Sequence, residues 1–522
     1  MRQANNNNNK NTLFWCNNSL VLKAYGKNAI SDFSLSLLID LFQKHIFIGN
    51  NKKILVSYQG NIKNYKLVEK INYCIAKHEH FVYNYGKKSS FDISLDDVAL
   101  RHNNLDYVVK IYGYKKNVYK IRVYDKSNMF LNNDVFRKIY EQYNKFDSKD
   151  YTGEIISNSY LTKKINVEEL ISIQCSHEEL LKDFTYIKSR YKSKSLMFSQ
   201  NDFTKKTLSK LFNNYESDVD VLNKPTLSEN DLFLKTIFDK SIFQRKKIQS
   251  IFKINDFSNI ETYLYVDKKY KYFNENQLML LYLDFLINEL KRSGINTKEL
   301  FVILPYNASF QIVELLKFYD VKYHYYNQKN INNFLNNENC LLTYANNKFN
   351  TNPRFSKVFN IYYFLISLIW MLNSFRNRNN LLSFKWKELY ENHGLVLYKH
   401  KEYKFDNSKI KSFIDIVSRN FNVTKAYFKN LKIYKSFMDD KYTLFKFTSD
   451  KKHQIIVFYD YITEKLIFDY QFCLESNKTS VSWYLDYLQM FFKFKKWMRQ
   501  AIKSNVSNLE NSIDMSKTIE YK

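Results

Sequence analysis

The sequence predicts an α/β protein, and two observations support this class. In the first third of the chain, a strand pattern over 53–58 (KILVSY) is followed by an amphipathic helix over 64–78 and a strand over 81–85. Such alternation is typical of layered α/β domains. A long apolar helix followed by a strand recurs over 272–304. The length of 522 residues is enough for about three or four domains of this kind.

The N-terminal region is organised around residues 105–128, which predict a strand, a tight polar join and a second strand. In the second strand, β-branched and aromatic side chains alternate with basic ones, as expected of a strand. The other elements expected here are a disordered Asn-rich tail over 1–12, a loop over 19–28, and helices over 30–47 and 133–144.

The middle of the chain continues the alternation after a polar link over 145–158. The patterns predict helices over 167–191, 205–213 and 228–251, strands over 195–199 and 219–222, and a further helix over 310–318. The long helix that starts near residue 275 is apolar nearly all round, so we expect it to be buried. Asn274 and Asn276 are both suitable N-caps for it.

Residues 358–372 (VFNIYYFLISLIWML) form the most apolar run of the chain. The run is about 15 residues long and includes Asn360 and Ser367, whereas a membrane-spanning helix needs about 20 apolar residues. We therefore interpret it as a buried core helix. Beyond it, the patterns predict a helix over 405–421, strands over 442–447 and 455–459, an aromatic-rich helix over 481–503 and a loose tail over 504–522.

Composition narrows the classes of function. The 80 Lys and Arg against 52 Asp and Glu give a net charge of +28, which suits a polyanionic partner. No Arg-rich stripe or dense basic block occurs, and the abundance of Asn, Lys, Ile, Tyr and Phe is typical of an A/T-rich genome. With only 8 Gly and no Gly-rich nucleotide motif, the chain has few loops able to wrap a phosphate with backbone amides.

Five scattered cysteines without a C-x-x-C pair, and an N-terminus without an apolar core, favour a reducing, cytoplasmic location. His78 and His80 stand two residues apart with no third ligand near them. They are interpreted as a surface pair and not as a metal site.

The stretch over 105–128 resembles the nucleophile region of the α-D-phosphohexomutases, the phosphoglucomutase and phosphomannomutase superfamily. The second strand, 119–124 (YKIRVY), is similar to the family's N-G-Y-K-V-Y, and 272–304 matches the family's long buried helix and strand. The resemblance implies three α/β/α domains and a C-terminal α+β domain around one central cleft. The implied domain boundaries are 13–150, 151–271, 272–394 and 395–503.

The resemblance also implies where the functional loops lie, and this sequence departs from the family pattern at each of them. Tyr112 occupies the position of the phosphorylated serine of T-A-S-H-N-P. The remaining positions are Asp256, Ser258 and Ile260 for the D-x-D-x-D metal loop; Ala345, Asn346 and Asn347 for the G-E-E-S sugar loop; and Lys446, Thr448 and Ser449 for the R-P-S-G-T-E-P phosphate loop. One carboxylate and one serine make a poor Mg²⁺ site, so no cofactor is expected.

Three functions remain open at this point. The first is a catalytically inactive member of the superfamily, a pseudoenzyme that binds a protein partner or an anion in the cleft. The second is an active mutase that interconverts sugar 1- and 6-phosphates with Mg²⁺ through divergent loops. The third is a basic polyanion-binding protein that uses Lys115, Lys116, Lys451 and Lys452, although nucleic acid is the less favoured ligand. We also expect Tyr112, Asp256, Ala345 and Thr448 to face one central space.

Overall fold

The structure is a computed structural model that describes the greater part of the chain in two compact units. The first unit comprises 1–278, 288–296 and 332–383, and the second 279–287, 297–331 and 384–522. The described residues are 13–15, 19–26, 29–59, 65–86, 93–115, 117–127, 131, 133–146, 161–175, 192–199, 202–215, 217–223, 248–254, 259–326, 333–334, 337–345, 348–351, 361–378, 381–406, 409–419, 430–438, 441–449, 452–460, 464–474, 491–492 and 494–496.

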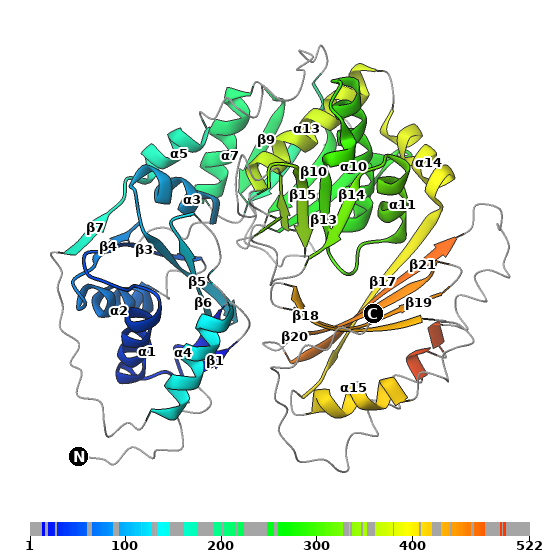
Figure 1. The fold of residues 1–522 in the computed structure, drawn as a ribbon. Coiled ribbons are helices and arrows are strands. Elements are labelled where there is room, and N and C mark those ends of the chain that lie inside the picture. The colour runs from blue at the N-terminus through cyan, green and yellow to red at the C-terminus, as the bar shows by residue number, and fades with distance from the viewer. Residues whose placement is uncertain are drawn as a thin grey trace. The chain divides into compact units, whose positions relative to one another are not determined.

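The fold is mixed α/β, as predicted, with four sheets (Figure 1). The first sheet has seven strands in the order β1-β2-β6-β5-β3-β4-β7. Its strands are β1 (Leu13–Trp15), β2 (Leu20–Lys23), β3 (Lys53–Gln59), β4 (Phe81–Asn84), β5 (Tyr107–Lys115), β6 (Val118–Asp125) and β7 (Thr162–Lys164). Strands β5, β3, β4 and β7 are parallel, whereas β5 and β6 form the antiparallel hairpin expected over 105–128.

The loop expected over 19–28 is wrong at residues 20–23, because β2 lies there and pairs with β6 along its whole length; residues 24–26 lie outside the strand, as expected. Leu20 and Leu22 of this strand are buried in the core. Its pairing partner, β6, is about 100 residues away in sequence, so a local sequence pattern does not predict this strand.

Helices cover both faces of the first sheet. They are α1 (Asp32–His45), α2 (Tyr65–Ala76), α3 (Ile93–His102) and α4 (Asn133–Lys145), and α5 (Val167–Cys175) packs on α3. The first, second and fourth pack on the face that carries Val56, Val109 and Ile121, while α3 lies on the opposite face (Figure 1). The expected helices over 30–47, 64–78 and 133–144 are confirmed. The helix expected over 167–191 is confirmed as far as Cys175, and its remainder lies outside the described residues.

The second sheet has the order β12-β11-β10-β8-β9. Its elements are β8 (Lys194–Ser199), α7 (Asp202–Asn214), β9 (Val219–Asn223), β10 (Ile248–Ile254), β11 (Ile260–Val266) and β12 (Lys269–Phe273). The helix expected over 228–251 is wrong at its end, because residues 248–251 belong to β10; residues 228–247 lie outside the described part. Strand β10 pairs with β8 and β11, and these long-range pairs decide its conformation.

The next region contains the elements α10 (Glu275–Arg292), the 3₁₀ turn η5 (Thr297–Glu299), β13 (Phe301–Leu304), α11 (Phe310–Phe318), β14 (Lys322–Tyr325), β15 (Cys340–Ala345), β16 (Lys348–Asn350), α13 (Ile361–Asn377) and α14 (Leu382–His393). Strands β13 to β16 belong to the third sheet. Asn274 caps α10 in a capping box with Gln277, which decides between the two caps considered. The run over 358–372 is a buried core helix in its described part, as expected.

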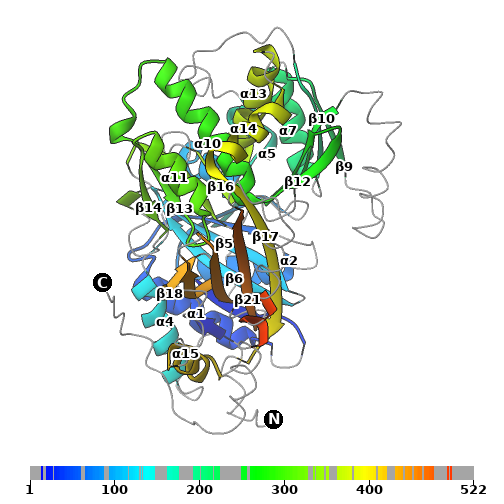
Figure 2. The same ribbon diagram turned by 90° about the vertical axis from the view of Figure 1, so that its right-hand side faces the viewer.

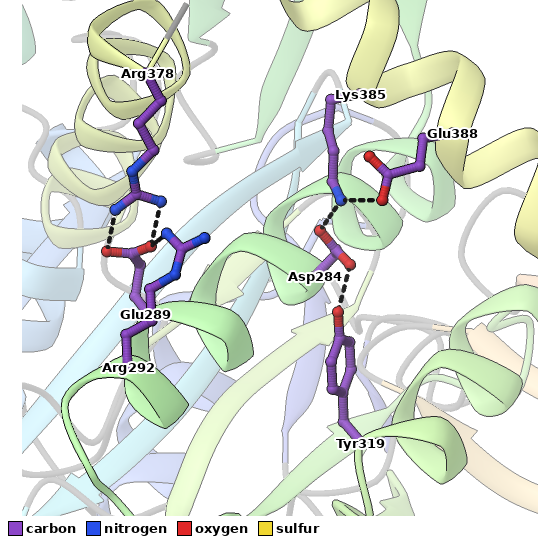
Figure 3. Close-up of polar contacts among 7 residues, drawn as sticks. All are labelled: Asp284, Glu289, Arg292, Tyr319, Arg378, Lys385 and Glu388. Carbon is purple, nitrogen blue, oxygen red and sulfur yellow. Dashed lines mark hydrogen bonds and ion pairs between the residues drawn. The ribbon is translucent and has the colours of Figure 1, made fainter. Parts of the chain in front are cut away.

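Two groups of charged side chains fasten α10 (Figure 3). In the first unit, the two carboxylate oxygens of Glu289 accept hydrogen bonds from the two terminal guanidinium nitrogens of Arg378, at 2.7 and 2.9 Å. In the second, the buried Asp284 carboxylate accepts the Tyr319 hydroxyl at 2.8 Å and the Lys385 ammonium at 2.9 Å. Burial alone would lower the pKa of Lys385, but its hydrogen bonds to Asp284 and Glu388 raise it above the ordinary value. A helix that is apolar nearly all round in sequence therefore also carries a buried ion pair.

The fourth sheet is antiparallel, in the order β17-β21-β20-β19-β18. Its elements are β17 (Leu395–Lys404), α15 (Ile410–Arg419), β18 (Asn430–Met438), β19 (Lys441–Thr448), β20 (Gln454–Asp460) and β21 (Lys465–Leu474). The helix α15 covers one face of this sheet (Figures 1 and 2). On that face, aromatic side chains such as Phe445, Phe468 and Phe472 form the core. Phe491 and Phe494 join this core. They belong to the helix expected over 481–503, of which residues 491–492 and 494–496 are described, and these are helical.

Among the described helices, none combines the length and the apolar character required to cross a membrane.

Candidate functional site

Tyr112 lies near the end of β5, where it pairs with Lys120 of β6 and, in parallel, with Gln59 of β3. Its hydroxyl lies 2.7 Å from the hydroxyl of Tyr124, and the guanidinium of Arg122 stands 5.9 Å from the centre of its ring. Burial, and then the neighbouring Tyr124, raise the pKa of Tyr112 well above the ordinary value of 10.0. The phenol is therefore held in its protonated form, which is a weak nucleophile.

Three cations, Lys110, Lys120 and Arg122, are buried on the same face of this hairpin. Lys110 makes an ion pair with Asp96 of α3 at 2.6 Å, and both side chains are almost wholly buried. Asp96 also accepts the hydroxyls of Ser57 at 2.7 Å and Tyr85 at 2.8 Å. Burial raises the pKa of Asp96, although Lys110 and the hydrogen bonds work in the opposite direction. Asp96 was not predicted from the sequence, where the alternating basic residues of the hairpin were the signal that buried cations would need a carboxylate partner.

At the expected metal loop, only Ile260 lies within the described residues. It is the first residue of β11, is buried, and pairs with Ile254 of β10. Its side chain serves the core of the second sheet and offers no oxygen ligand. Within the described part of the chain, no three His, Cys, Asp or Glu side chains gather in a way that could hold a metal ion. Asp256 and Ser258 lie outside that part, so the statement about the metal loop stays a prediction.

At the expected sugar loop, Ala345 is the last residue of β15 and pairs with Lys348 of β16. It is buried, with 2% of its surface exposed. Asn346 and Asn347 lie outside the described residues. A buried methyl group cannot recognise a sugar hydroxyl, so this position provides no polar contact.

The expected phosphate loop is the hairpin turn between β19 and β20. The hydroxyl of Ser449 accepts the amide of His453 at 3.0 Å, and the amide of Ser449 donates to the carbonyl of His453 at 2.9 Å. Thr448 is half-buried and pairs with Gln454. Lys452 adopts a positive φ of 61° in the turn and forms an ion pair with Glu314. Both the hydroxyl and the backbone of Ser449 therefore close the turn.

The side chain of Lys446 contacts residues outside that turn. Its buried ammonium donates to the carbonyl of Tyr306 at 3.1 Å and stands 5.4 Å from the ring centre of Tyr325. Burial, together with repulsion from Lys432 on the next strand, lowers the pKa of Lys446 from 10.5 to about 8. The cation at the position of the family's arginine is thus used inside the protein.

His80 corrects another expectation. Its side chain is fully buried, so it is not part of a surface pair. Its Nδ1 accepts the amide of Lys52 at 3.2 Å, and its Nε2 contacts the side-chain oxygen of Gln43. These partners require a neutral ring, and burial lowers the pKa of His80 from 6.5 to about 4. His78 is half-buried and contacts Asp40 at 2.7 Å.

The chain matches no family profile and no curated protein sequence. Solved structures are nevertheless similar. A phosphoglucomutase/phosphomannomutase family protein from Burkholderia thailandensis superposes with a TM-score of 0.65 at 10% identity, over 93% of this chain and 97% of that one. The exocytosis-sensitive phosphoprotein pp63/parafusin (phosphoglucomutase) from Paramecium, in its open form, gives 0.62 at 11% identity, over 92% and 93%. The chain therefore has the multidomain α/β fold of phosphoglucomutase and phosphomannomutase proteins.

Proposed function

We propose that this protein is a phosphohexomutase-like pseudoenzyme, with a binding or structural role. The observation that carries the proposal is the state of Tyr112, at the position where the resembling family has its phosphorylated serine. A phosphoryl acceptor must lose its proton as it attacks. The Tyr112 hydroxyl is hydrogen-bonded to that of Tyr124, and its pKa is raised well above 10.0.

The other loop positions support the same proposal. Phosphoryl transfer depends mainly on positioning and on stabilisation of charge. The buried ammonium of Lys446 donates a hydrogen bond to the carbonyl of Tyr306. The hydroxyl of Ser449 accepts a hydrogen bond within its own turn, and the side chain of Ala345 is a buried methyl group. A charged phosphosugar would find neither a free cation from Lys446 nor a polar group from Ala345. The ligand of a retained cleft would be a protein segment or an anion that is bound without turnover.

The experiment is an assay of mutase turnover with a sugar 1-phosphate, Mg²⁺ and a bisphosphate primer. We expect no turnover above that of the buffer, in the wild type and in Tyr112→Phe alike. Tyr124→Phe is the matched control, because it removes the hydrogen bond to Tyr112 and leaves the Tyr112 hydroxyl in place. Wild-type turnover that disappears in Tyr112→Phe and persists in Tyr124→Phe would favour the active mutase with divergent loops.

The polyanion-binding alternative receives less support. Lys452, one of its four lysines, is paired with Glu314 and lies 5.3 Å from the ring centre of Phe310. A steep fall of nucleic-acid affinity with salt concentration would nevertheless establish this alternative.

A further inference from the structure

The loop between β13 and α11, residues 305–309, is held by side chains of the fourth sheet; both parts belong to the second compact unit. Three consecutive carbonyls of the loop accept side-chain donors. The contacts are Lys446 Nζ to Tyr306 O at 3.1 Å, Gln471 Nε2 to Asn307 O at 2.6 Å and Gln454 Nε2 to Ala308 O at 2.9 Å. The loop also has an internal turn, in which the amide of Ala308 donates to the carbonyl of Pro305 at 2.9 Å.

A fourth contact connects the loop to a histidine. The side-chain amide of Asn307 donates to Asp469 Oδ2 at 3.1 Å, and Asp469 Oδ1 lies 2.6 Å from Nδ1 of His400. The other ring nitrogen of His400 lies 3.3 Å from a carboxylate oxygen of Glu402. His400 and Asp469 are cross-strand partners on β17 and β21, so the register of the sheet fixes this arrangement.

The geometry has a definite requirement for protons. A carboxylate only accepts hydrogen bonds, so each of these contacts needs an N–H on the ring, and an imidazole has two only when it is charged. The hydrogen bond from Lys465 lowers the pKa of Glu402, and His400 contributes to the same shift, which keeps Glu402 an acceptor. After His400 loses one ring proton, either Asp469 or Glu402 would face the lone pair of a ring nitrogen, which repels a carboxylate oxygen.

The charged neighbours of this group come from three strands. Glu402 lies on β17, Asp469 and Lys465 lie on β21, and Lys446 of β19 is in the same cross-strand row as Asp469, two strands away. From the loop, the neutral side chain of Asn307 reaches Asp469, and Ser309 is a hydrogen-bond partner of the buried hydroxyl of Tyr398 on β17, whose pKa burial raises. The imidazole is half-exposed, so protons from solvent reach it.

We propose that His400, Asp469 and Asn307 form a proton-dependent clasp that holds the 305–309 loop on the fourth sheet. With His400 charged, Asp469 is fixed between the imidazolium and the amide of Asn307, and the loop is held. When His400 loses its proton, Asp469 loses its cationic partner and the loop loosens. The loop follows the carboxyl end of β13, the end at which open α/β sheets bind ligands. The clasp would therefore couple proton concentration to access at this end of the sheet.

Hydrogen–deuterium exchange of the full-length chain tests the clasp. The readout is the protection of a peptide that covers residues 305–312, which includes the Ala308 amide. It is followed between about pH 5 and about pH 8, the range in which an ordinary histidine changes charge. Rates are corrected for intrinsic exchange with an unstructured peptide. In the wild type, we expect protection to fall by roughly two- to tenfold as pH rises, which corresponds to the loss of one or two surface ion pairs.

Two variants and one control make the test specific. His400→Gln and Asp469→Asn should show low protection at low pH and lose the fall with pH, apart from any part contributed by Lys446, which also titrates near this range. His102→Gln is the matched control, because His102 makes a similar half-exposed pair with Glu169 in the first unit. It should keep the wild-type profile. Peptides of the first sheet verify folding in every sample. A wild-type profile that does not change with pH, or an unchanged fall in His400→Gln, would overturn the proposal.

Discussion

Replacing Lys446 with Met should stabilise the protein near neutral pH, because it removes a buried charge. In the folded chain, the pKa of Lys446 is about 8 against an ordinary 10.5. A difference of 2.5 units corresponds to a cost of about 3 kcal/mol for keeping the ammonium charged at pH 7. The variant also loses the hydrogen bond to Tyr306, worth about 1 kcal/mol. We therefore expect a net gain of about 2 kcal/mol at pH 7.

The sign of the pH dependence follows from the same shift. Between pH 8 and 10.5 the unfolded chain binds more protons at this lysine than the folded chain does, so wild-type stability rises with pH across this window. In Lys446→Met this contribution is absent. The advantage of the variant over the wild type should therefore shrink between pH 7 and pH 10.

Urea unfolding of both proteins at a series of pH values measures this advantage, and the difference between them cancels other titrating groups. Lys432→Met is the matched control. It removes the exposed cross-strand lysine that repels Lys446, so it should stabilise slightly and weaken the pH dependence without abolishing it. The reasoning would be refuted if Lys446→Met destabilised the protein at pH 7 by a pH-independent amount. That result would mean that the ammonium is stabilised in place.

Three further predictions rest on buried or strained groups. The pKa of His80 is lowered to about 4, so as pH falls the unfolded chain takes up this proton before the folded chain does. In urea titrations between pH 6.5 and pH 4, the wild type should therefore lose about 2 kcal/mol of stability relative to His80→Gln, and a constant difference would contradict this. Asp96→Ala should lower the free energy of unfolding by about 3–5 kcal/mol, because it leaves Lys110 buried without its carboxylate. The double variant Asp96→Ala/Lys110→Met should recover part of this loss, because it removes the unpaired charge as well. Lys268→Gly should raise the thermal midpoint through a gain of about 1 kcal/mol, because Lys268 has a φ of 63° in the β11–β12 turn, and a fall in the midpoint would contradict this.

The sequence alone was sufficient wherever the relevant interaction is local. The helix over 310–318 was predicted with the bounds of α11, and the hairpin over 105–128 is present as β5 and β6. Periodicity and propensity act over a few residues, so the type of an element can be read without knowledge of its neighbours. The resemblance to phosphohexomutases was likewise visible from the order of the elements, and the similar solved structures bear out the fold.

The chemistry of the candidate site was decided by the tertiary structure. The sequence placed Tyr112 near the end of a strand, but only the register of β5 and β6 brings its hydroxyl to Tyr124. Asp96 carries no local signature, and it became the partner of Lys110 because α3 packs on that face of the sheet. Lys446 was expected at a phosphate loop, yet its ammonium is buried against Tyr306. The physical reason is common to these cases: the cost of a buried polar group depends on the distance to its partner, and that distance is set by packing between segments remote in sequence.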